Sequence, residues 1–132
     1  PQHCANGQAV AQFLQSNPKV ASVRYPGLPD DEFHALAQKY LPNGSCGVVS
    51  FEVAGGRAEA ERFMAALRLF AIETHVADAR SCCLHPASST HRQMSDEELV
   101  AAGISPSMVR LSCGLEAGED LVADLDQALA SV

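Results

Sequence analysis

The residue of this chain best suited to binding an anion is Arg110, which lies inside a short apolar segment, residues 108–113. A guanidinium stays charged at any working pH, so a half-buried strand rarely carries one without a partner. Its planar fork matches a carboxylate or a phosphate, which it can hold through two parallel hydrogen bonds. Two interpretations remain open at this point: a structural salt bridge to a carboxylate of the chain itself, or a bound anionic ligand.

Cysteines and histidines gather in the middle of the chain, where a zinc site has to be considered: His75, Cys82, Cys83, His85 and His91. Adjacent residues of a strand point to opposite faces, so the two neighbouring cysteines cannot easily share one tetrahedral metal site. We interpret them as small hydrophobic residues and expect no metal. An imidazole titrates near neutral pH, which suits acid–base chemistry, but we favour a loop-holding role for His85 and His91.

Regular structure must position these residues, and the spacing of apolar side chains predicts both helices and strands. Helices are expected at the start of the chain up to Asn17-Pro18, after a cap at Asp30 or Asp31, over 57–70, between a Ser95–Glu98 capping box and Gly103, and over 121–129. Strands are expected over 20–25, 47–53, 81–84 and 108–113.

These helices and strands do not alternate regularly enough for a doubly wound parallel sheet. We therefore expect one α+β domain over residues 1–132, with a small, mainly antiparallel sheet and helices packed on one face. The other face would be free unless a second domain covers it. The first residues already have a helical pattern, so we expect the chain to be cut at a domain boundary.

Composition narrows the class of protein. The 132 residues are 47% hydrophobic and 19% charged, as in a folded globular domain. A formal net charge of −7 with scattered basic residues argues against nucleic acid as a partner. No apolar run is long enough to span a membrane, and no signal-peptide pattern opens the chain. Five cysteines without a CxxC pair favour a reducing compartment, so we expect a cytoplasmic protein.

Several motifs in a fixed order resemble one family: DARS at 78–81, HPASSTH at 85–91, AGIS at 102–105 and VRLSCGLE at 109–116. The family is that of the transsulfuration (Cys/Met metabolism) enzymes, which use pyridoxal 5′-phosphate. Earlier segments also fit, at 25–28, 34–42 and 44–51, so the resemblance covers about residues 3–129. Within the family, the O-acetylhomoserine sulfhydrylase branch is the most similar.

The resemblance implies roles for three residues. The arginine matching Arg110 binds the α-carboxylate of the amino-acid substrate, which orients the bonds at Cα for reaction. The serine matching Ser81 lies beside that carboxylate, and Thr90 is expected to line the substrate pocket. Arg80 stands where lysine is common, and a surface or interface charge is its expected role.

The resemblance also implies that a complete enzyme is much longer than this chain. Its larger, earlier domain supplies the lysine that holds the cofactor, and the fold is that of the C-terminal domain of fold-type I transferases. Of the two lysines here, Lys19 lies in a turn and Lys39 in a helix, without a neighbouring phosphate-binding loop. We therefore expect no catalytic, cofactor-binding or metal-binding residue in this chain, which alone would be inactive.

The implied reaction replaces the acetoxy group of O-acetylhomoserine with sulfide or methanethiol and belongs to methionine biosynthesis. The implied partners are an amino-acid substrate, the N-terminal domain of the same chain and, in the complete enzyme, three further subunits of a homotetramer. Two alternatives remain: a cystathionine γ-synthase or methionine γ-lyase of the same family, and a stand-alone α+β module that binds amino acids through Arg110.

Overall fold

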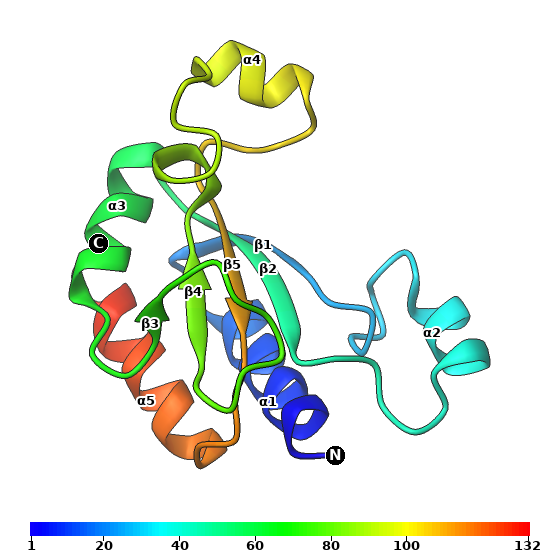
Figure 1. Cartoon of the computed structure of the whole chain (residues 1–132). Coiled ribbons are helices and arrows are strands. Elements are labelled where there is room, and N and C mark those ends of the chain that lie inside the picture. The colour runs from blue at the N-terminus through cyan, green and yellow to red at the C-terminus, as the bar shows by residue number, and fades with distance from the viewer.

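A five-stranded sheet organises the computed structural model, which describes all 132 residues, in the strand order β1-β2-β5-β4-β3 (Figure 1). The strands are β1 (Val20–Arg24), β2 (Val48–Val53), β3 (Ala71–Ile72), β4 (Cys82–Leu84) and β5 (Met108–Ser112). Every neighbouring pair is antiparallel except β3 and β4, which are parallel. The expected mainly antiparallel sheet is confirmed, and the two-residue strand β3 is an addition to it.

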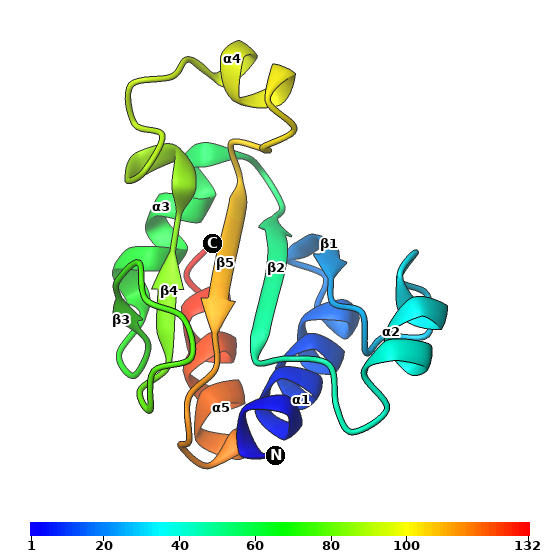
Figure 2. The ribbon, with the colours of Figure 1, turned by 45° about the vertical axis from the view of Figure 1, so that its right-hand side comes forward.

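Five α-helices surround the sheet: α1 (Gln2–Ser16), α2 (His34–Tyr40), α3 (Arg57–Ala66), α4 (Asp96–Ala101) and α5 (Gly118–Leu129). Helices α1, α3 and α5 pack on one face of the sheet, whereas α2 stands away from it on the side of β1 and α4 stands beyond the ends of the strands (Figures 1 and 2). The expected α+β class is confirmed. None of the helices combines the length and the hydrophobicity that crossing a membrane requires.

The hydrophobic core lies between the sheet and helices α1, α3 and α5. Side chains of β2 alternate, with Val49, Phe51 and Val53 buried and the residues between them partly exposed. Strand β5 adds Val109 and Leu111, both buried. Burial of such a side chain contributes about 1.5–3 kcal/mol relative to exposure. Burial of these residues fixes which face of the sheet meets the helices, and the strand residues between them lie on the opposite face.

Helix α3 ends earlier than the sequence pattern predicts. The pattern continued to Phe70, but the helix stops at Ala66. The carboxylate of Asp124 on α5 accepts hydrogen bonds from the backbone N–H groups of Arg68 (2.9 Å), Leu69 (2.8 Å) and Phe70 (3.1 Å). These bonds hold the segment in a non-helical turn, so a residue more than fifty positions away ends the helix.

The start of α2 also differs from expectation. Asp31 does not cap the helix, and Phe33 stands at the N-cap position without a capping side-chain bond. The Asp31 carboxylate instead accepts the N–H groups of Tyr25 (2.9 Å) and Phe33 (2.9 Å), which ties the turn before α2 to the end of β1. Neither Asp30 nor Asp31 therefore caps α2 in the way the sequence suggested.

The capping box at the start of α4 is confirmed. The Ser95 hydroxyl accepts the Glu98 N–H at 3.3 Å, and the Glu98 carboxylate accepts the Ser95 N–H at 2.8 Å. Gly103 follows the helix with a φ of 77°, a left-handed conformation that glycine adopts without steric cost. Both ends of this short helix are thus encoded locally.

Candidate functional site

Arg110 lies on the open face of the sheet, opposite the helices. Its strand neighbours Val109 and Leu111 point into the core, so the alternation of side chains places Arg110 on the other face. The strand register sets Arg110 between Ser50 of β2 and Leu84 of β4. The guanidinium therefore starts from the middle strand of the sheet, where backbone pairing on both sides holds β5 rigidly.

The Arg110 guanidinium has no carboxylate partner. Its Nη2 donates to the backbone carbonyl of Thr74 at 3.0 Å, and no acidic side chain lies within 4.0 Å of it. The only other arginine that is not exposed, Arg57, is paired with Asp96. The structural salt bridge, one of the two interpretations open from the sequence, is therefore absent, and N–H donors of Arg110 remain free.

A pocket of about 390 Å³ opens in front of Arg110. This volume lies within the range typical of small-molecule sites, about 300–1,000 Å³. The lining residues come from three strands and the loops between them: Ser50, Thr74, Leu84, Pro86, Thr90, His91, Ile104, Met108 and Arg110. A cationic floor with apolar walls and a few hydroxyl groups suits a small ligand that carries one carboxylate.

Thr90 and His91 lie on the wall of this pocket. The Thr90 Oγ1 and the His91 Nδ1 are 2.9 Å apart, so the two side chains form one polar group. Thr90 was a candidate from the sequence, whereas a loop-holding role was favoured for His91. The adjacency of His91 to Thr90 in the same run was the signal that could have identified it as a lining residue.

His85 has the loop-holding role expected of it. The side chain is buried, with its Nε2 at 2.8 Å from the Pro106 carbonyl and its Nδ1 at 2.8 Å from the Ser88 hydroxyl. Both ring nitrogens are therefore occupied by neighbouring groups. The imidazole joins the loop after β4 to the segment that enters β5, and these are the two segments that flank the pocket.

Ser81 does not lie in the Arg110 pocket. Its buried hydroxyl donates to the Glu116 carboxylate at 2.8 Å and accepts the Gly114 N–H at 2.7 Å. The Ser81 N–H donates to the other Glu116 oxygen at 2.7 Å. Burial alone would raise the pKa of Glu116, but hydrogen bonds from Ser81 and from the backbone of Glu116, together with His3, lower the pKa below its usual value. The structure thus brings Arg110 and Thr90 together but places Ser81 in a separate hydrogen-bonded group.

Comparison with known proteins identifies the family. Residues 1–130 match the family described as Cys/Met metabolism PLP-dependent enzyme. The chain belongs to this family. It is 44% identical over 131 residues to the O-acetyl-L-homoserine sulfhydrylase of Leptospira meyeri, covering 98% of this chain and 30% of the relative. It is also 44% identical over 127 residues to the L-methionine gamma-lyase of Pseudomonas putida, covering 96% of this chain and 32% of the relative.

A solved structure of the family has the same fold. A Campylobacter jejuni protein described as an O-acetylhomoserine (thiol)-lyase superposes with a TM-score of 0.89 at 42% identity, over 98% of this chain and 31% of that one. That crystal structure contains N′-pyridoxyl-lysine-5′-monophosphate. The resemblance found in the motifs is confirmed, and the chain spans about 30% of the length of the curated relatives it matches.

The cofactor of this family needs a lysine amine, which this chain does not place at the Arg110 pocket. Lys19 is exposed and donates its Nζ to the carbonyl of Val132. Lys39 is exposed and lies 4.9 Å from the centre of the Tyr40 ring. Neither lysine lines the pocket, so the residues of this chain do not by themselves form a pyridoxal phosphate site.

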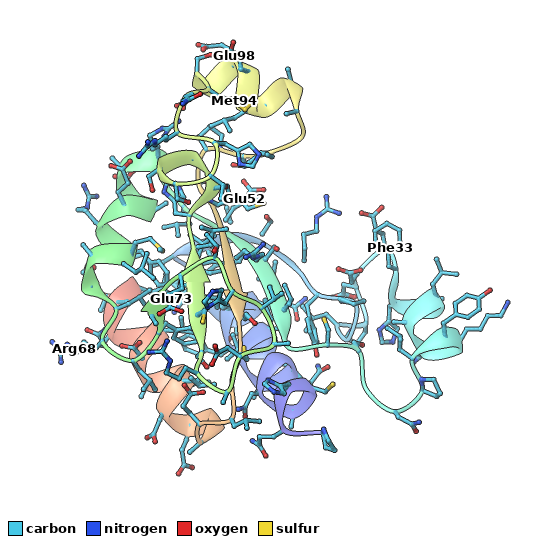
Figure 3. The ribbon with its side chains drawn as sticks, in the orientation of Figure 1. Phe33, Glu52, Arg68, Glu73, Met94 and Glu98 are labelled. Atoms are coloured by element: carbon cyan, nitrogen blue, oxygen red, sulfur yellow. The ribbon has the colours of Figure 1, made fainter.

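A loop after β3, residues 73–80, holds the carbonyl that contacts Arg110. Glu73 lies where the chain leaves β3 (Figure 3), and its carboxylate is 2.9 Å from the Arg80 guanidinium and 3.1 Å from His75 Nδ1. The Ser112 hydroxyl accepts the Ala77 N–H at 3.0 Å, which joins the loop to β5. Arg80 is thus an exposed surface charge, as expected, but one that ties the two ends of this loop together.

The two neighbouring cysteines point to opposite faces of the sheet, as expected from strand geometry. Cys82 pairs with Ser112 and shares the open face with Leu84, whereas Cys83 lies in the core beside the Met64 sulfur at 3.1 Å. Complete burial raises the pKa of the Cys83 thiol well above its usual value. The thiol is therefore neutral and acts as a small hydrophobic group.

Proposed function

We propose that this chain is the C-terminal, substrate-side domain of a pyridoxal phosphate-dependent O-acetylhomoserine sulfhydrylase. The complete enzyme would replace the acetoxy group of O-acetylhomoserine with sulfide or methanethiol, giving homocysteine or methionine and acetate. The observation that carries the proposal is the Arg110 guanidinium, which faces a 390 Å³ pocket and has no acidic partner. The family to which the chain belongs supplies the class of reaction.

Arg110 binds the substrate α-carboxylate in this proposal. A guanidinium has five N–H donors, of which the Thr74 carbonyl takes one, so enough remain for a two-point contact with a carboxylate. Two parallel hydrogen bonds fix both the position and the rotation of the carboxylate. They thereby orient the bonds at Cα, which is the carbon where the reaction begins. The Thr90 hydroxyl, on the wall of the same pocket, is the second proposed substrate contact.

The contact between Ser81 and the substrate stays a prediction. Its hydroxyl proton is committed to Glu116, and its N–H donates to the same carboxylate. A contact with substrate would require Glu116 to move or the substrate carboxylate to approach from the side of Gly114. The bonds as they stand favour a role in fixing the chain after β5.

The cofactor, when bound, withdraws electrons from Cα and so makes its proton removable. This chain contributes the carboxylate contact, while the lysine that binds the cofactor would come from the larger N-terminal domain. The complete protein is proposed to be a cytoplasmic homotetramer. These assignments rest on the family, because the chain spans about 30% of its relatives.

A second candidate lies in the same family. The methionine gamma-lyase relative is as similar as the sulfhydrylase relative, with 44% identity in each case, so a methionine γ-lyase has comparable support and a cystathionine γ-synthase stays an alternative within the family. Full-length protein loaded with cofactor should form homocysteine and acetate from O-acetylhomoserine and sulfide. Turnover of methionine or cystathionine without turnover of O-acetylhomoserine would assign the other branch.

A third candidate, of another class, is a stand-alone module that binds amino acids through Arg110. The mass of the native gene product separates it from an enzyme. A product about three times the length of this chain would agree with an enzyme, since the chain covers 30% of its relatives. A native product of 132 residues would favour the module.

A further inference from the structure

One arginine holds both ends of the segment that carries the polar wall of the Arg110 pocket. The Nη1 of Arg57 donates to the Ala87 carbonyl at 2.9 Å. The Nε of Arg57 donates at 2.9 Å to the Asp96 carboxylate, which also pairs with the Nη2. We call residues 87–96 the wall segment, and one guanidinium therefore restrains both of its ends.

The wall segment and the helix after it have no other polar anchor on the body of the domain. Residues 87–104 make hydrogen bonds and ion pairs only with residues 85–108 and with Arg57. The His91 N–H, for example, donates to the Pro86 carbonyl at 2.9 Å. The first residue of α3 is thus the one polar link between this part of the chain and the helices that cover the sheet.

Apolar packing alone does not fix the wall segment. Thr90 is exposed and His91 is half-buried, so neither side chain is held in the core. Helix α4, which follows the segment, stands away from the sheet (Figure 2) and buries a single residue, Leu99. Burial of such a side chain is favourable but non-directional, so the direction of the segment has to come from its hydrogen bonds.

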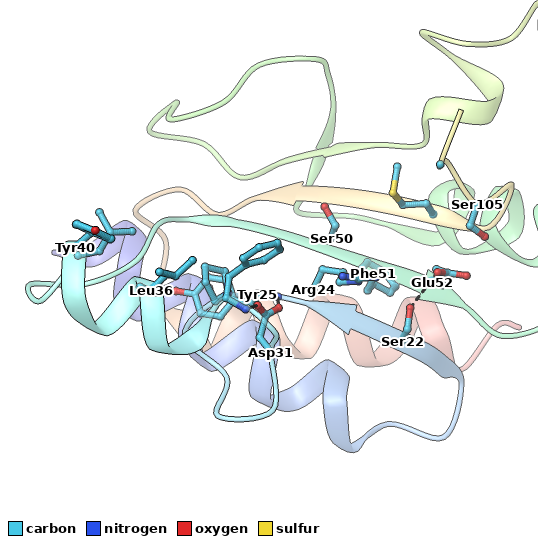
Figure 4. A pocket seen from close by; sticks show the side chains of 16 residues that line it. Ser22, Arg24, Tyr25, Asp31, Leu36, Tyr40, Ser50, Phe51, Glu52 and Ser105 are labelled. Atoms are coloured by element: carbon cyan, nitrogen blue, oxygen red, sulfur yellow. Dashed lines mark hydrogen bonds between the residues drawn. The ribbon is translucent and has the colours of Figure 1, made fainter. Parts of the chain in front are cut away.

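The chain after α4 is anchored to the sheet instead. The Ser107 hydroxyl donates to the Glu52 carboxylate of β2 at 3.5 Å and lies 3.0 Å from the Ser105 hydroxyl. Figure 4 shows Ser105 and Glu52 close to one another on the lining of a larger pocket, of about 870 Å³. This end of the chain is held independently of Arg57, so loss of Arg57 should release the wall segment first.

Removal of the Arg57 side chain would leave the Ala87 carbonyl without its partner. Ala87 is buried, and an unsatisfied buried carbonyl costs free energy. The backbone can recover this cost by moving until the carbonyl meets water, and Thr90, three residues further on, moves with it. Arg110 should keep its place, because strand pairing and the Thr74 carbonyl hold it.

We propose that Arg57 is a positioning residue of the substrate pocket, which holds the wall segment so that the Thr90 hydroxyl meets the carboxylate bound by Arg110. The inference rests on the proposed function, because Thr90 contacts the substrate only in that proposal. Arg57 does not itself line the pocket. It acts through the backbone of the wall segment, and so it affects the binding of the substrate rather than the bonds that react.

Kinetics of the full-length holoenzyme test the route through Thr90. Arg57→Leu should raise KM for O-acetylhomoserine about three- to tenfold, with kcat within about twofold, because a binding contact is weakened. In a Thr90→Val background the same substitution should change KM by less than about twofold, since the contact is already lost. Arg62→Leu breaks an exposed ion pair with Glu59 on the same helix and should leave KM unchanged.

Hydrogen exchange tests the restraint without any substrate. Backbone amides of residues 88–95 should exchange at least about tenfold faster in Arg57→Leu than in the wild type, whereas Arg62→Leu should match the wild type. Asp96→Ala breaks the ion pair from its exposed side. It should accelerate the same amides, and it keeps the test valid where Arg57→Leu does not fold.

Three results would overturn the proposal. The first is unchanged exchange of residues 88–95 in both Arg57→Leu and Asp96→Ala. The second is an undiminished effect of Arg57→Leu on KM in the Thr90→Val background, and the third is faster exchange with an unchanged KM. The proposed function is judged separately. Turnover of another amino acid in place of O-acetylhomoserine would sink it, and the exchange data, with the cycle repeated on that amino acid, would still decide the role of Arg57.

Discussion

The Nη2 of Arg110 donates to the backbone carbonyl of Thr74 over 3.0 Å, so a loop outside the central strands aims the guanidinium. Thr74 follows Glu73, whose carboxylate is paired with Arg80 at 2.9 Å. Because Glu73 and Arg80 stand at the two ends of this loop, their ion pair limits how far the Thr74 carbonyl can move. The direction of the Arg110 side chain thus depends on Glu73 and Arg80, which do not line the pocket.

Loss of the Arg80 charge should weaken substrate binding more than it weakens the fold. In the full-length enzyme, Arg80→Leu is expected to raise KM for the amino-acid substrate about two- to fivefold, with little change in kcat. An exposed ion pair of this kind contributes only about 0.2–1 kcal/mol to stability, so the unfolding midpoint should barely move. Steady-state kinetics with Arg92→Leu, an exposed arginine without an ion pair, provide the control. Equal effects of the two variants would show that the loop does not aim Arg110.

Ala77 has a left-handed backbone, with a φ of 59°. This conformation costs a non-glycine residue about 1–2 kcal/mol, whereas the extra flexibility of glycine in the unfolded chain costs about 0.5–1 kcal/mol. Ala77→Gly should therefore raise the free energy of unfolding by about 0.5–1 kcal/mol, measured by urea denaturation. The reverse change at Gly103, Gly103→Ala, where φ is 77° and no atom crowds the new Cβ, should lower it by a similar amount. A stability loss in Ala77→Gly would argue against the strain.

Asp124 should be among the most sensitive polar positions of the fold. Its buried carboxylate accepts three backbone N–H groups, from residues 68–70, which would otherwise lack partners. Asp124→Ala is expected to cost about 2–4 kcal/mol, because hydrogen bonds to charged groups contribute about 1.5–3 kcal/mol each and solvent can replace part of them. Thermal and urea unfolding should register the loss. The exposed Asp126→Ala on the same helix should cost little, and a similar loss in both variants would refute the special role of Asp124.

The stability of the fold should depend on pH through the Glu116 carboxylate. Its pKa is lower in the folded state than its usual value of about 4.3. A pKa that is lowered by folding adds to the free energy of unfolding at pH values above the pKa of the unfolded state. This contribution disappears as the pH falls through the pKa of the folded state. Ser81→Ala removes a hydrogen bond that lowers this pKa. The variant should therefore lose more stability at about pH 6 than in acid below the folded-state pKa of Glu116, where the carboxyl is protonated in both proteins. Urea unfolding at both pH values checks this, and an equal loss at both would exclude Glu116 as the cause.

Local patterns were sufficient to predict most of the secondary structure. The alternation of Val49, Phe51 and Val53 marks β2, and the Ser95–Glu98 box marks the start of α4, since each is encoded within a few residues. The early end of α3 could not be predicted, because the carboxylate responsible, Asp124, belongs to a distant helix. Strand β3 has only two residues, too few to give a pattern.

The candidate site could be predicted in part. The type and place of Arg110 in an apolar strand were enough to single out a side chain that faces a pocket, and Thr90 does share this pocket. The absence of a carboxylate near Arg110 depends on the pairing of β5 with β2 and β4, which sequence spacing does not give. His91 could have been found from its adjacency to Thr90. The same pairing determines that Ser81 lies with Glu116 rather than in the pocket.

The most direct test of the central claim compares two substrates in the wild type and in Arg110→Ala. Full-length enzyme is assayed with O-acetylhomoserine and with its α-carboxamide, which keeps the shape but lacks the negative charge. The wild type should prefer the acid by about 30- to 5,000-fold in kcat/KM, equivalent to the 2–5 kcal/mol typical of a buried charged contact. Arg110→Ala should lose most of this preference, while Arg92→Ala should keep it. An undiminished preference in Arg110→Ala would show that another residue binds the carboxylate.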